Sequence, residues 1–263
     1  MEIVFKDYKY KDKKLSFTIK NNKINGLYGN HLNDLVDLIR LNSKEYSSIK
    51  IDGKELSKEI VFEKKKSISI VEETLEQDIH ETNINEHLIE YMKQYEIYPK
   101  NLSKKIKDAL KIVGLKEEIL LKNIYGISSF EQKMIQLVKA LLLNPEVIIL
   151  DNTLAFLDMK QSKRLMMVLR KIKDQFKKTI VIISNDVNTL YQETEHLIIY
   201  KNNRILIEDS TDIVFQKVDF LKKHDIPIPD IVEFTYLVKK NKKVKLDYHK
   251  DVRDIIKDIY KHI

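Results

Sequence analysis

Two short segments consist almost entirely of large apolar residues. Residues 147–150 read Val-Ile-Ile-Leu and residues 179–184 read Thr-Ile-Val-Ile-Ile-Ser. Neither segment alternates apolar with polar residues, so each predicts a strand that is buried on both faces of a sheet. Between them, residues 160–175 have the apolar spacing of a helix. Two buried strands joined by a helix predict a right-handed parallel unit, and therefore an α/β fold.

The flanking segments predict how the rest of the chain is organised. Short strands are expected in the first thirty residues, where β-branched and aromatic residues alternate with polar turns, and they predict an antiparallel sheet that leads into a buried strand. A helix is expected from Leu35 to Asn42, a strand at 67–71, helices over about 83–121, and one helix over 128–143. We therefore predict a domain over 1–211, with a helical subdomain at about 74–143, and a helical extension over 212–263 that breaks at Ile226–Pro229.

Composition narrows the classes of function. The net charge is +7, but only five of the 47 basic residues are arginine. Because nucleic-acid readout depends on bidentate arginine contacts, we expect a solvated lysine-rich surface and no nucleic-acid partner. The chain has no cysteine, which excludes disulfides and thiolate metal sites. Its longest apolar runs are far shorter than the ~18 residues of a membrane span, and its first residues have no apolar segment that predicts secretion.

An aspartate ends the first buried strand, at the sheet edge where open α/β folds place ligands. By itself Asp151 is equally consistent with a magnesium ligand and with a cap of the next helix. Its neighbours favour the first role, because their order and spacing resemble an ATP-binding cassette (ABC) ATPase. The resemblance makes Asp151 the end of the Walker B strand and Leu157-Asp158 the end of the D-loop. It also makes residues 127–132 the signature, and residues 179–186 the final core strand, which ends at the switch position.

The resemblance covers nearly the whole chain. Tyr10 lies where the family stacks an aromatic ring on adenine, and residues 24–35 lie where the phosphate loop belongs. Residues 214–240 resemble the C-terminal extension of the ATPases in energy-coupling factor transporters, which take up vitamins and metal ions. The implied fold is that of an ABC ATPase, with a parallel core sheet, an N-terminal antiparallel β subdomain, a helical insertion and a C-terminal helical extension.

The expected phosphate loop departs from the pattern G-x-x-x-x-G-K-[ST]. Gly26 and Gly29 are in place, but the lysine position is Leu32, which cannot neutralise a phosphate. Asp34 adds a negative charge nearby, and we expect Asn33 or Asp34 to cap a helix that begins at Leu35, so that the loop is closed by its own side chains. The nucleotide-binding candidates are Tyr10, Gly26, Gly29, Asn30, His31, Leu32, Asn33 and Asp34.

The other positions that the resemblance assigns to catalysis also differ from the family pattern. Asn152 stands in place of the glutamate that activates water, and Asn185 stands in place of the switch histidine. Glu72 or Glu73 stands in place of a glutamine. In the signature, Phe130 is expected to obstruct the approach to a partner's phosphate, while Ser128 remains as a donor. The signature and D-loop candidates are Ser128, Ser129, Phe130, Glu131 and Asp158, and the metal candidate is Asp151.

These departures lead to a main hypothesis and two alternatives. The main hypothesis is a catalytically impaired subunit of an importer similar to the energy-coupling factor type, with weakened binding of ATP and Mg²⁺. Its implied partners are a second ABC ATPase subunit and an integral membrane subunit, at the cytoplasmic face of the membrane. The helical insertion would dock the membrane subunit, and residues 212–263 would make dimer contacts. The alternatives are a true ATPase with unusual residues, and a scaffold that kept only the fold.

Overall fold

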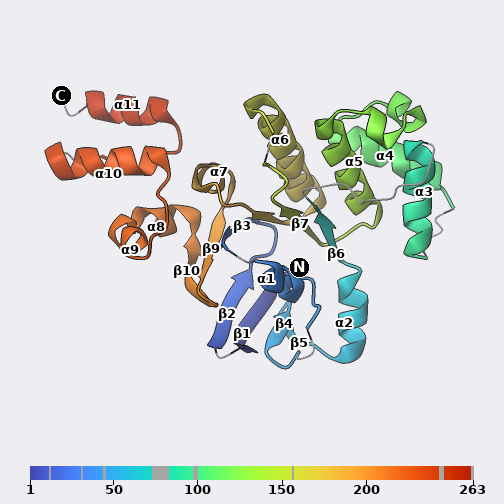
Figure 1. The fold of residues 1–263 in the computed structure, drawn as a ribbon, viewed down its shortest axis with the longest axis horizontal. Helices are drawn as coiled ribbons and strands as arrows, with labels where there is room; N and C mark the ends of the chain where they lie inside the picture. Colours follow the sequence, from blue (N-terminus) through green and yellow to red (C-terminus); the bar gives the residue numbers. More distant parts are fainter. Residues whose placement is uncertain are drawn as a thin grey trace.

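The computed structural model describes residues 1–11, 13–30, 32–43, 46–72, 83–96, 100–155, 157–242 and 246–261. Within these ranges the chain forms a central sheet, a smaller sheet below it, a block of helices on one side and a helical tail on the other (Figure 1). No helix in the described ranges is long and apolar enough to cross a membrane.

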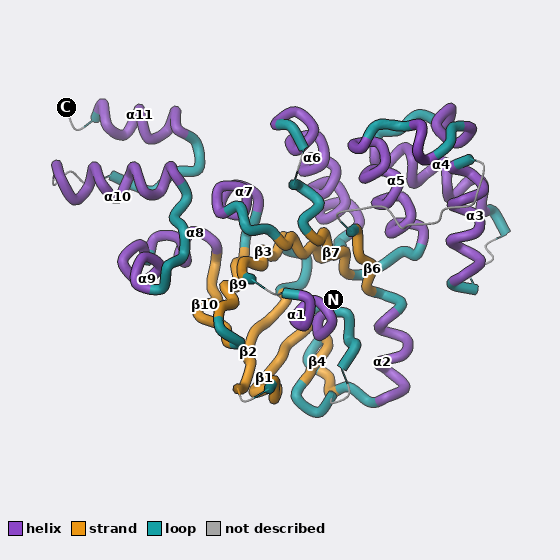
Figure 2. Tube along the Cα trace, in the orientation of Figure 1, coloured by secondary structure: helices purple, strands orange, loops and turns teal. Residues whose placement is uncertain are grey.

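The central sheet has six strands, and five of them are parallel. Its order is β10-β9-β3-β8-β7-β6, so the early strand β3 lies between strands from the second half of the chain (Figure 2). The strands are β3 (Ile24–Gly29), β6 (Ile68–Val71), β7 (Val147–Asp151), β8 (Thr179–Ile183), β9 (His196–Lys201) and β10 (Arg204–Ser210). Because β7 and β8 pair in parallel, the predicted α/β unit is confirmed.

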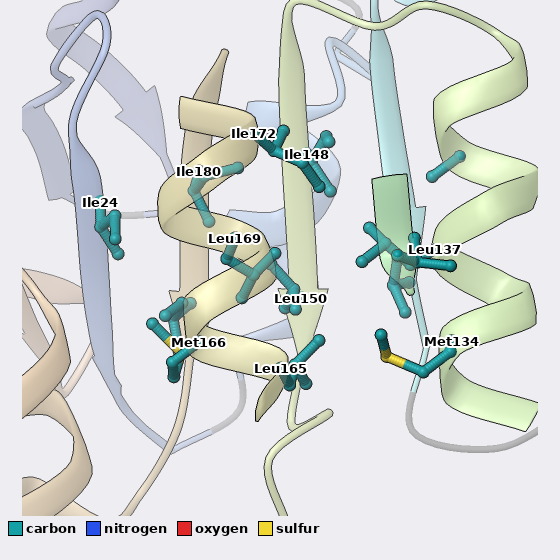
Figure 3. Packing of buried hydrophobic residues seen from close by; sticks show 14 of the residues in the cluster. Ile24, Met134, Leu137, Ile148, Leu150, Leu165, Met166, Leu169, Ile172 and Ile180 are labelled. Atoms are coloured by element: carbon teal, nitrogen blue, oxygen red, sulfur yellow. The ribbon is translucent and has the colours of Figure 1, made fainter. Parts of the chain in front are cut away.

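Both faces of the sheet are covered, as the all-apolar strands predicted. On one face, Ile148 and Leu150 of β7 meet the buried side of helix α6 (Met159–Phe176) (Figure 3). On the other face, Val147 and Ile149 belong to a second hydrophobic cluster, which includes the smaller sheet. The strand therefore alternates between two cores.

The smaller sheet is antiparallel and has the order β2-β1-β4-β5. This confirms the predicted N-terminal antiparallel sheet. Helix α1 follows β3 and buries its apolar side in the second cluster, and helix α2 precedes β6. The elements are β1 (Ile3–Tyr10), β2 (Lys13–Ile19), β4 (Ile49–Ile51), β5 (Lys54–Glu55), α1 (Asn33–Ile39) and α2 (Lys58–Lys65).

The predicted helical segment forms a block beside β6 (Figure 1). Its last helix packs against α4 and β6 and leads into β7. The elements are α3 (Ile84–Gln94), α4 (Leu102–Val113), the 3₁₀ turns η1 (Glu117–Leu121) and η2 (Ile124–Gly126), and α5 (Ser129–Leu142). The start of the expected subdomain, residues 74–82, lies outside the described residues.

The tail is helical and breaks at Ile226–Pro229, as predicted, because proline cannot continue a helix. Its last two helices lie side by side at the end of the molecule opposite α3–α5 (Figure 1). The helices that follow β8 are α7 (Val187–Glu193), α8 (Thr211–Gln216), α9 (Val218–Lys223), α10 (Asp230–Lys242) and α11 (Val252–Tyr260).

Two expectations about the core were wrong. The strand at 179–186 is not the last core strand, since β9 pairs in parallel with β3 and β10 pairs with β9. Helix α1 begins at Asn33 rather than Leu35, and its N-cap is Leu32, without a side-chain hydrogen bond. Asn33 and Asp34 lie inside the first turn, so neither caps the helix.

Candidate functional site

The carboxyl ends of the parallel strands bring most of the predicted site residues to one edge of the sheet. Asp151 of β7 is in register with Ile183 of β8, which is in register with Leu27 of β3. Glu72 follows β6, and Asn185 lies two residues after β8; both side chains are exposed. Parallel sheets with helical connections place their ligands at this edge.

The expected phosphate loop is mostly strand. β3 continues through Gly29, and its last five residues pair with β9, so Gly26 lies in mid-strand. A Cβ atom at Gly26 would lie 3.0 Å from side-chain atoms of Leu197 and Thr194. A Cβ atom at Gly29 would lie 2.2 Å from the carbonyl oxygen of Tyr200. The close approach of β9 and its neighbours therefore explains both glycines without reference to a ligand.

Only residues 30–32 connect β3 to α1, and His31 lies outside the described residues. Leu32, at the position where the pattern has lysine, is 8% exposed and belongs to the second hydrophobic cluster. Its carbonyl accepts the first helical hydrogen bond from Val36, at 2.8 Å. This position therefore contributes apolar packing and no charge at the start of the helix.

A polar cluster links this helix to the smaller sheet. The Tyr10 hydroxyl donates a hydrogen bond to the Asp34 carboxylate, and the Lys11 amino group lies 3.4 Å from the same carboxylate. The hydrogen bond from Tyr10, followed by that from Lys11, holds the pKa of Asp34 below its usual value. Tyr10, whose ring was predicted to stack on adenine, is thus hydrogen-bonded to Asp34 at the predicted phosphate position. Asn30 is exposed nearby in the sequence, between Gly29 and the undescribed His31.

The turn after β7 has an unusual backbone. Asn152 has a φ of 47°, which is the left-handed region that asparagine tolerates better than most residues. Its N–H donates to the carbonyl of Ile183 at 3.2 Å, and the buried Thr153 hydroxyl donates to the carbonyl of Val71 at 2.9 Å. These bonds tie the turn to β8 and to β6. Asp151 is half-buried at the start of the turn.

Asp151 is the residue predicted to bind a metal ion. The residues that the structure describes contain no group of three histidine, aspartate or glutamate side chains placed to hold a metal ion. Carboxylate, hydroxyl and phosphate oxygens are the usual Mg²⁺ ligands in phosphoryl-transfer sites. The family pattern has a hydroxyl residue at position 33, but Asn33 has no hydroxyl oxygen to offer to Mg²⁺.

The predicted signature residues begin helix α5. Ser128 is its N-cap and forms a capping box with Glu131: the Ser128 hydroxyl donates to the Glu131 carboxylate at 2.7 Å and accepts from the Glu131 N–H at 3.3 Å. The hydrogen bond from the Ser128 hydroxyl contributes most to lowering the pKa of Glu131. Ser129 is exposed.

Phe130, which we expected to obstruct the approach to a partner's phosphate, turns away from the surface instead. Its side chain is 6% exposed and packs in the main hydrophobic cluster, with the Arg164 guanidinium 5.4 Å from the ring centre. A phenylalanine at the second position of an amphipathic helix turns inward when the core offers it space, and a sequence pattern gives no view of that space.

Asp158 caps helix α6. Its carboxylate accepts from the Gln161 N–H at 2.8 Å, and the Gln161 side chain accepts from the Asp158 N–H at 3.2 Å. Glu73, the alternative to Glu72 next to β6, lies outside the described residues.

Sequence reasoning missed three residues that shape this site. Lys11 pairs with Asp34 at the surface, and Thr153 ties the turn after β7 to β6. Asn25 is fully buried in β3 just before Gly26, and its amide group donates to the carbonyls of Lys20 and Ile180 at 3.0 and 3.2 Å. A polar residue inside an otherwise apolar strand was the available signal for Asn25.

Comparisons with known proteins agree with this architecture. Residues 13–155, more than half of the chain, match the family model described as ABC transporter. The energy-coupling factor transporter ATP-binding protein EcfA2 of Clostridium acetobutylicum is 26% identical over 184 residues, which cover 70% of this chain and 60% of that protein. The corresponding EcfA1 of Ligilactobacillus salivarius is 24% identical over 221 residues, covering 82% and 78%.

One similar solved structure is cbiO1 from Clostridium perfringens, described as part of the ABC transporter complex cbiONQ. It has a TM-score of 0.72 at 20% identity and covers 89% of this chain and 98% of that one. A dimeric ATP-binding cassette, MJ0796, has a TM-score of 0.63 at 20% identity, covering 80% and 98%. At these identities the likeness concerns the fold.

Proposed function

Because the chain belongs to the ABC transporter family, we propose that it is an impaired nucleotide-binding subunit of a membrane importer of the energy-coupling factor type. The family uses ATP and Mg²⁺ in general. In the proposal, this chain is the non-hydrolysing half of a pair with a second ABC ATPase subunit. It sits on the cytoplasmic face of the membrane and transmits force to an integral membrane subunit. The similarity to energy-coupling factor ATP-binding proteins supports this class of importer.

The observation that carries the proposal is the start of helix α1. Phosphate loops bind phosphate with backbone N–H groups, a lysine and a hydroxyl. Here Leu32 is packed in the core, and β3 uses the preceding backbone for pairing with β9. A lost charge-assisted hydrogen bond costs about 1.5–3 kcal/mol, roughly tenfold to a hundredfold in affinity. Asp34, held by Tyr10 and Lys11, adds a negative charge where phosphates would approach.

The turn after β7 supports impaired hydrolysis. Asn152 has no group that can accept a proton from water, and loss of a general base costs roughly 10²- to 10⁴-fold in rate. Asn185 at the switch position also lacks a titratable ring. Asp151 would hold Mg²⁺ if a nucleotide brought the ion, but the described residues around it do not complete a metal site. The residues present therefore fit a hydrolysing arrangement poorly, and no hydrolytic step is assigned to them.

The tail supports the proposed dimer contacts. A cavity of about 660 Å³ with mainly apolar walls lies between α7, α10 and α11. Three large apolar residues at this place are exposed: Phe234 by 51%, Val252 by 58% and Ile256 by 46%. Exposed apolar patches of this kind mark protein contacts. The helical block α3–α5 lies at the other end of the molecule, where the proposal places the membrane subunit (Figure 1).

Calorimetric titration with ATP and Mg²⁺ tests the proposal, on the chain alone and then mixed with an intact ABC ATPase from the same cell. The proposal expects binding only in the mixture, because the partner's phosphate loop would face this chain's α5. Tight binding to the chain alone refutes an impaired phosphate site. Absence of binding in both refutes the paired subunit and favours the scaffold that kept only the fold.

A functional ATPase is the second candidate, and Lys11 favours it. Its amino group lies 3.4 Å from Asp34 at the expected phosphate position, so it is a candidate to replace the missing lysine. A steady-state turnover assay decides between the two functions. Turnover that disappears in both Lys11→Met and Asp151→Ala would support the ATPase, with Lys104→Gln, at an exposed position of α4, as the control variant.

A further inference from the structure

A second cavity of the helical tail lies between α9 and the last turns of α10 (Figure 1). Its volume is about 600 Å³, and pockets for small-molecule ligands usually measure about 300–1,000 Å³. Its charged residues and tyrosines come from separate parts of the tail: Lys217 and Asp219 at the start of α9, Tyr236, Lys239 and Lys240 in α10, and Tyr248 before α11. The described lining shares no residue with the apolar cavity to which dimer contacts are assigned above.

Three lysine side chains line this cavity. The Lys239 amino group lies 4.6 Å from the centre of the Tyr248 ring, and the Lys240 amino group lies 5.6 Å from the centre of the Tyr236 ring. Such contacts hold an ammonium group against a ring face without cancelling its charge. Among the described residues, no ion pair of Lys217, Lys239 or Lys240 is found.

The acidic side chains at this place are already engaged. The Asp219 carboxylate accepts a hydrogen bond from the Tyr236 hydroxyl at 2.6 Å. Glu233 pairs at 2.7 Å with Lys222, whose amino group lies 5.4 Å from the centre of the Tyr236 ring. The described lining holds three lysines and one aspartate, so it carries two net positive charges.

Tyr248 adds a neutral hydrogen-bond donor. Burial, followed by the charge interactions with Tyr236 and Asp219, raises the pKa of Tyr248 above its usual value, so its hydroxyl keeps its proton at neutral pH. Within the described part of the chain, no hydrogen bond of this hydroxyl is found. A neutral hydroxyl can donate to an anionic oxygen without adding negative charge to the cavity. Phe220, whose ring centre lies 4.3 Å from that of His224, supplies an apolar part of the wall.

We propose that this cavity binds an organic phosphate monoester, with its phosphate at the lysine amino groups and its organic part against Phe220. A phosphate monoester carries about −1.5 to −2 charges at neutral pH, which match the net charge of the lining. Lysine binds phosphate as a point charge, whereas planar carboxylates favour the fork of arginine, and the described lining contains no arginine.

The size of the cavity favours an ester over free phosphate. A volume of about 600 Å³ leaves room beside a phosphate group, and the wall there is partly apolar. The site does not rest on the proposed function, because its lining contains none of the candidate nucleotide-binding residues.

The experiment is calorimetric titration of the purified full chain with phenyl phosphate, ribose 5-phosphate and inorganic phosphate at equal ionic strength. We expect an ester to bind with a Kd of about 0.1–1 mM and at least tenfold more tightly than inorganic phosphate, because its organic part adds contacts with the wall. The two esters distinguish the sources of this chemistry: tighter binding of phenyl phosphate indicates an aromatic ester, and tighter binding of ribose 5-phosphate indicates a sugar ester.

Two variants and a matched control locate the binding. The double change Lys239→Gln with Lys240→Gln should weaken ester binding at least tenfold, because it removes two of the three ammonium groups. Tyr248→Phe keeps the ring beside Lys239 but should weaken binding about threefold to tenfold, because it removes the hydroxyl donor. The control is Lys104→Gln with Lys105→Gln, at exposed positions of α4, which changes the net charge equally and should retain the affinity.

If the variant of α10 does not fold, Lys217→Gln at the junction of α8 and α9 takes its place, with an expected loss of about tenfold.

Three results overturn the proposal. Absence of binding by both esters refutes the site. Inorganic phosphate that binds as tightly as the esters reduces the site to an ion contact of the lysines. Equal affinities of the α10 variant and the α4 control show that ester binding follows net charge or another part of the chain. None of these results concerns the impaired ATPase, and tight binding of ATP to the chain alone would refute that function while the ester site stands.

Discussion

Asn25→Leu should lower the free energy of unfolding by about 3 kcal/mol. The Asn25 side chain is fully buried and has five polar contacts. Its amide N–H groups donate to the carbonyls of Lys20, Lys23 and Ile180 at 3.0, 3.4 and 3.2 Å. Its oxygen accepts from the Lys20 N–H at 2.9 Å and faces the His196 ring nitrogen at 3.1 Å.

The magnitude follows from these contacts. An amide makes at most two donated and two accepted hydrogen bonds, which contribute about 1–1.5 kcal/mol each, and the burial of a leucine in place of the amide returns about 2 kcal/mol. Leucine has the branched shape of asparagine but larger terminal groups, so the change in packing adds to the loss and does not offset it. Because β3 ends at the candidate phosphate position, the loss should also loosen the start of α1.

The assay is urea unfolding followed by far-UV circular dichroism, since the chain has no tryptophan. Asn42→Leu is the matched control. Among the described residues its amide donates to Asp37 alone, at 3.2 Å on the exposed surface, and we expect a change below about 0.5 kcal/mol. A loss of less than about 1 kcal/mol for Asn25→Leu, with an unchanged m value, would refute this account of the buried network.

Four further changes test the site and its surroundings. Gly29→Ala should destabilise the chain by about 2–3 kcal/mol in urea unfolding, because its Cβ meets a backbone carbonyl; a neutral result would contradict the close approach of β9. Tyr10→Phe should raise the pKa of Asp34 in a carboxyl NMR titration, since it removes the main hydrogen bond that lowers it. Asn152→Val should cost about 1–2 kcal/mol because of the left-handed backbone, whereas Asn152→Gly should be nearly neutral; equal losses would exclude backbone strain. Burial alone raises the pKa of Glu195, but hydrogen bonds from the Ile24 N–H and a lysine lower this pKa overall. The Glu195 carboxylate therefore stabilises the folded chain fully above about pH 4.5. This stabilisation disappears as the pH falls through the folded-state pKa. The difference in unfolding free energy between wild type and Glu195→Gln should therefore shrink toward acidic pH, and a constant difference would contradict the assignment.

Much of the core could be predicted from local pattern. The apolar runs of β7 and β8 and the helical spacing of α5 and α6 reflect burial, because buried positions require apolar side chains whatever their partners are. The hairpin of β9 and β10 was missed, although a signal was present: Asn202 and Asn203 both have positive φ and form its two-residue turn. An Asn-Asn pair indicates such a turn less strongly than Asn-Gly.

The candidate site was less predictable because it depends on contacts between distant segments. The sequence shows which residue types occupy the phosphate position. It does not show that Leu32 packs inward or that the Tyr10 hydroxyl donates a hydrogen bond to Asp34. Asparagine and aspartate are favoured helix caps, and this preference led to the wrong cap for α1. The packing of Leu32 in the second hydrophobic cluster fixed the start of the helix instead.

The central place of β3 has a consequence for synthesis of the protein. β3 is made early, yet its neighbours β8 and β9 follow more than 150 residues later. At about 5–20 residues per second, the ribosome needs roughly 8–30 s to supply them. During that time the backbone N–H and C=O groups along both edges of β3 have no strand partner, and a chain released before Lys201 could not close its sheet. Growing chains should therefore depend on chaperones until β9 emerges.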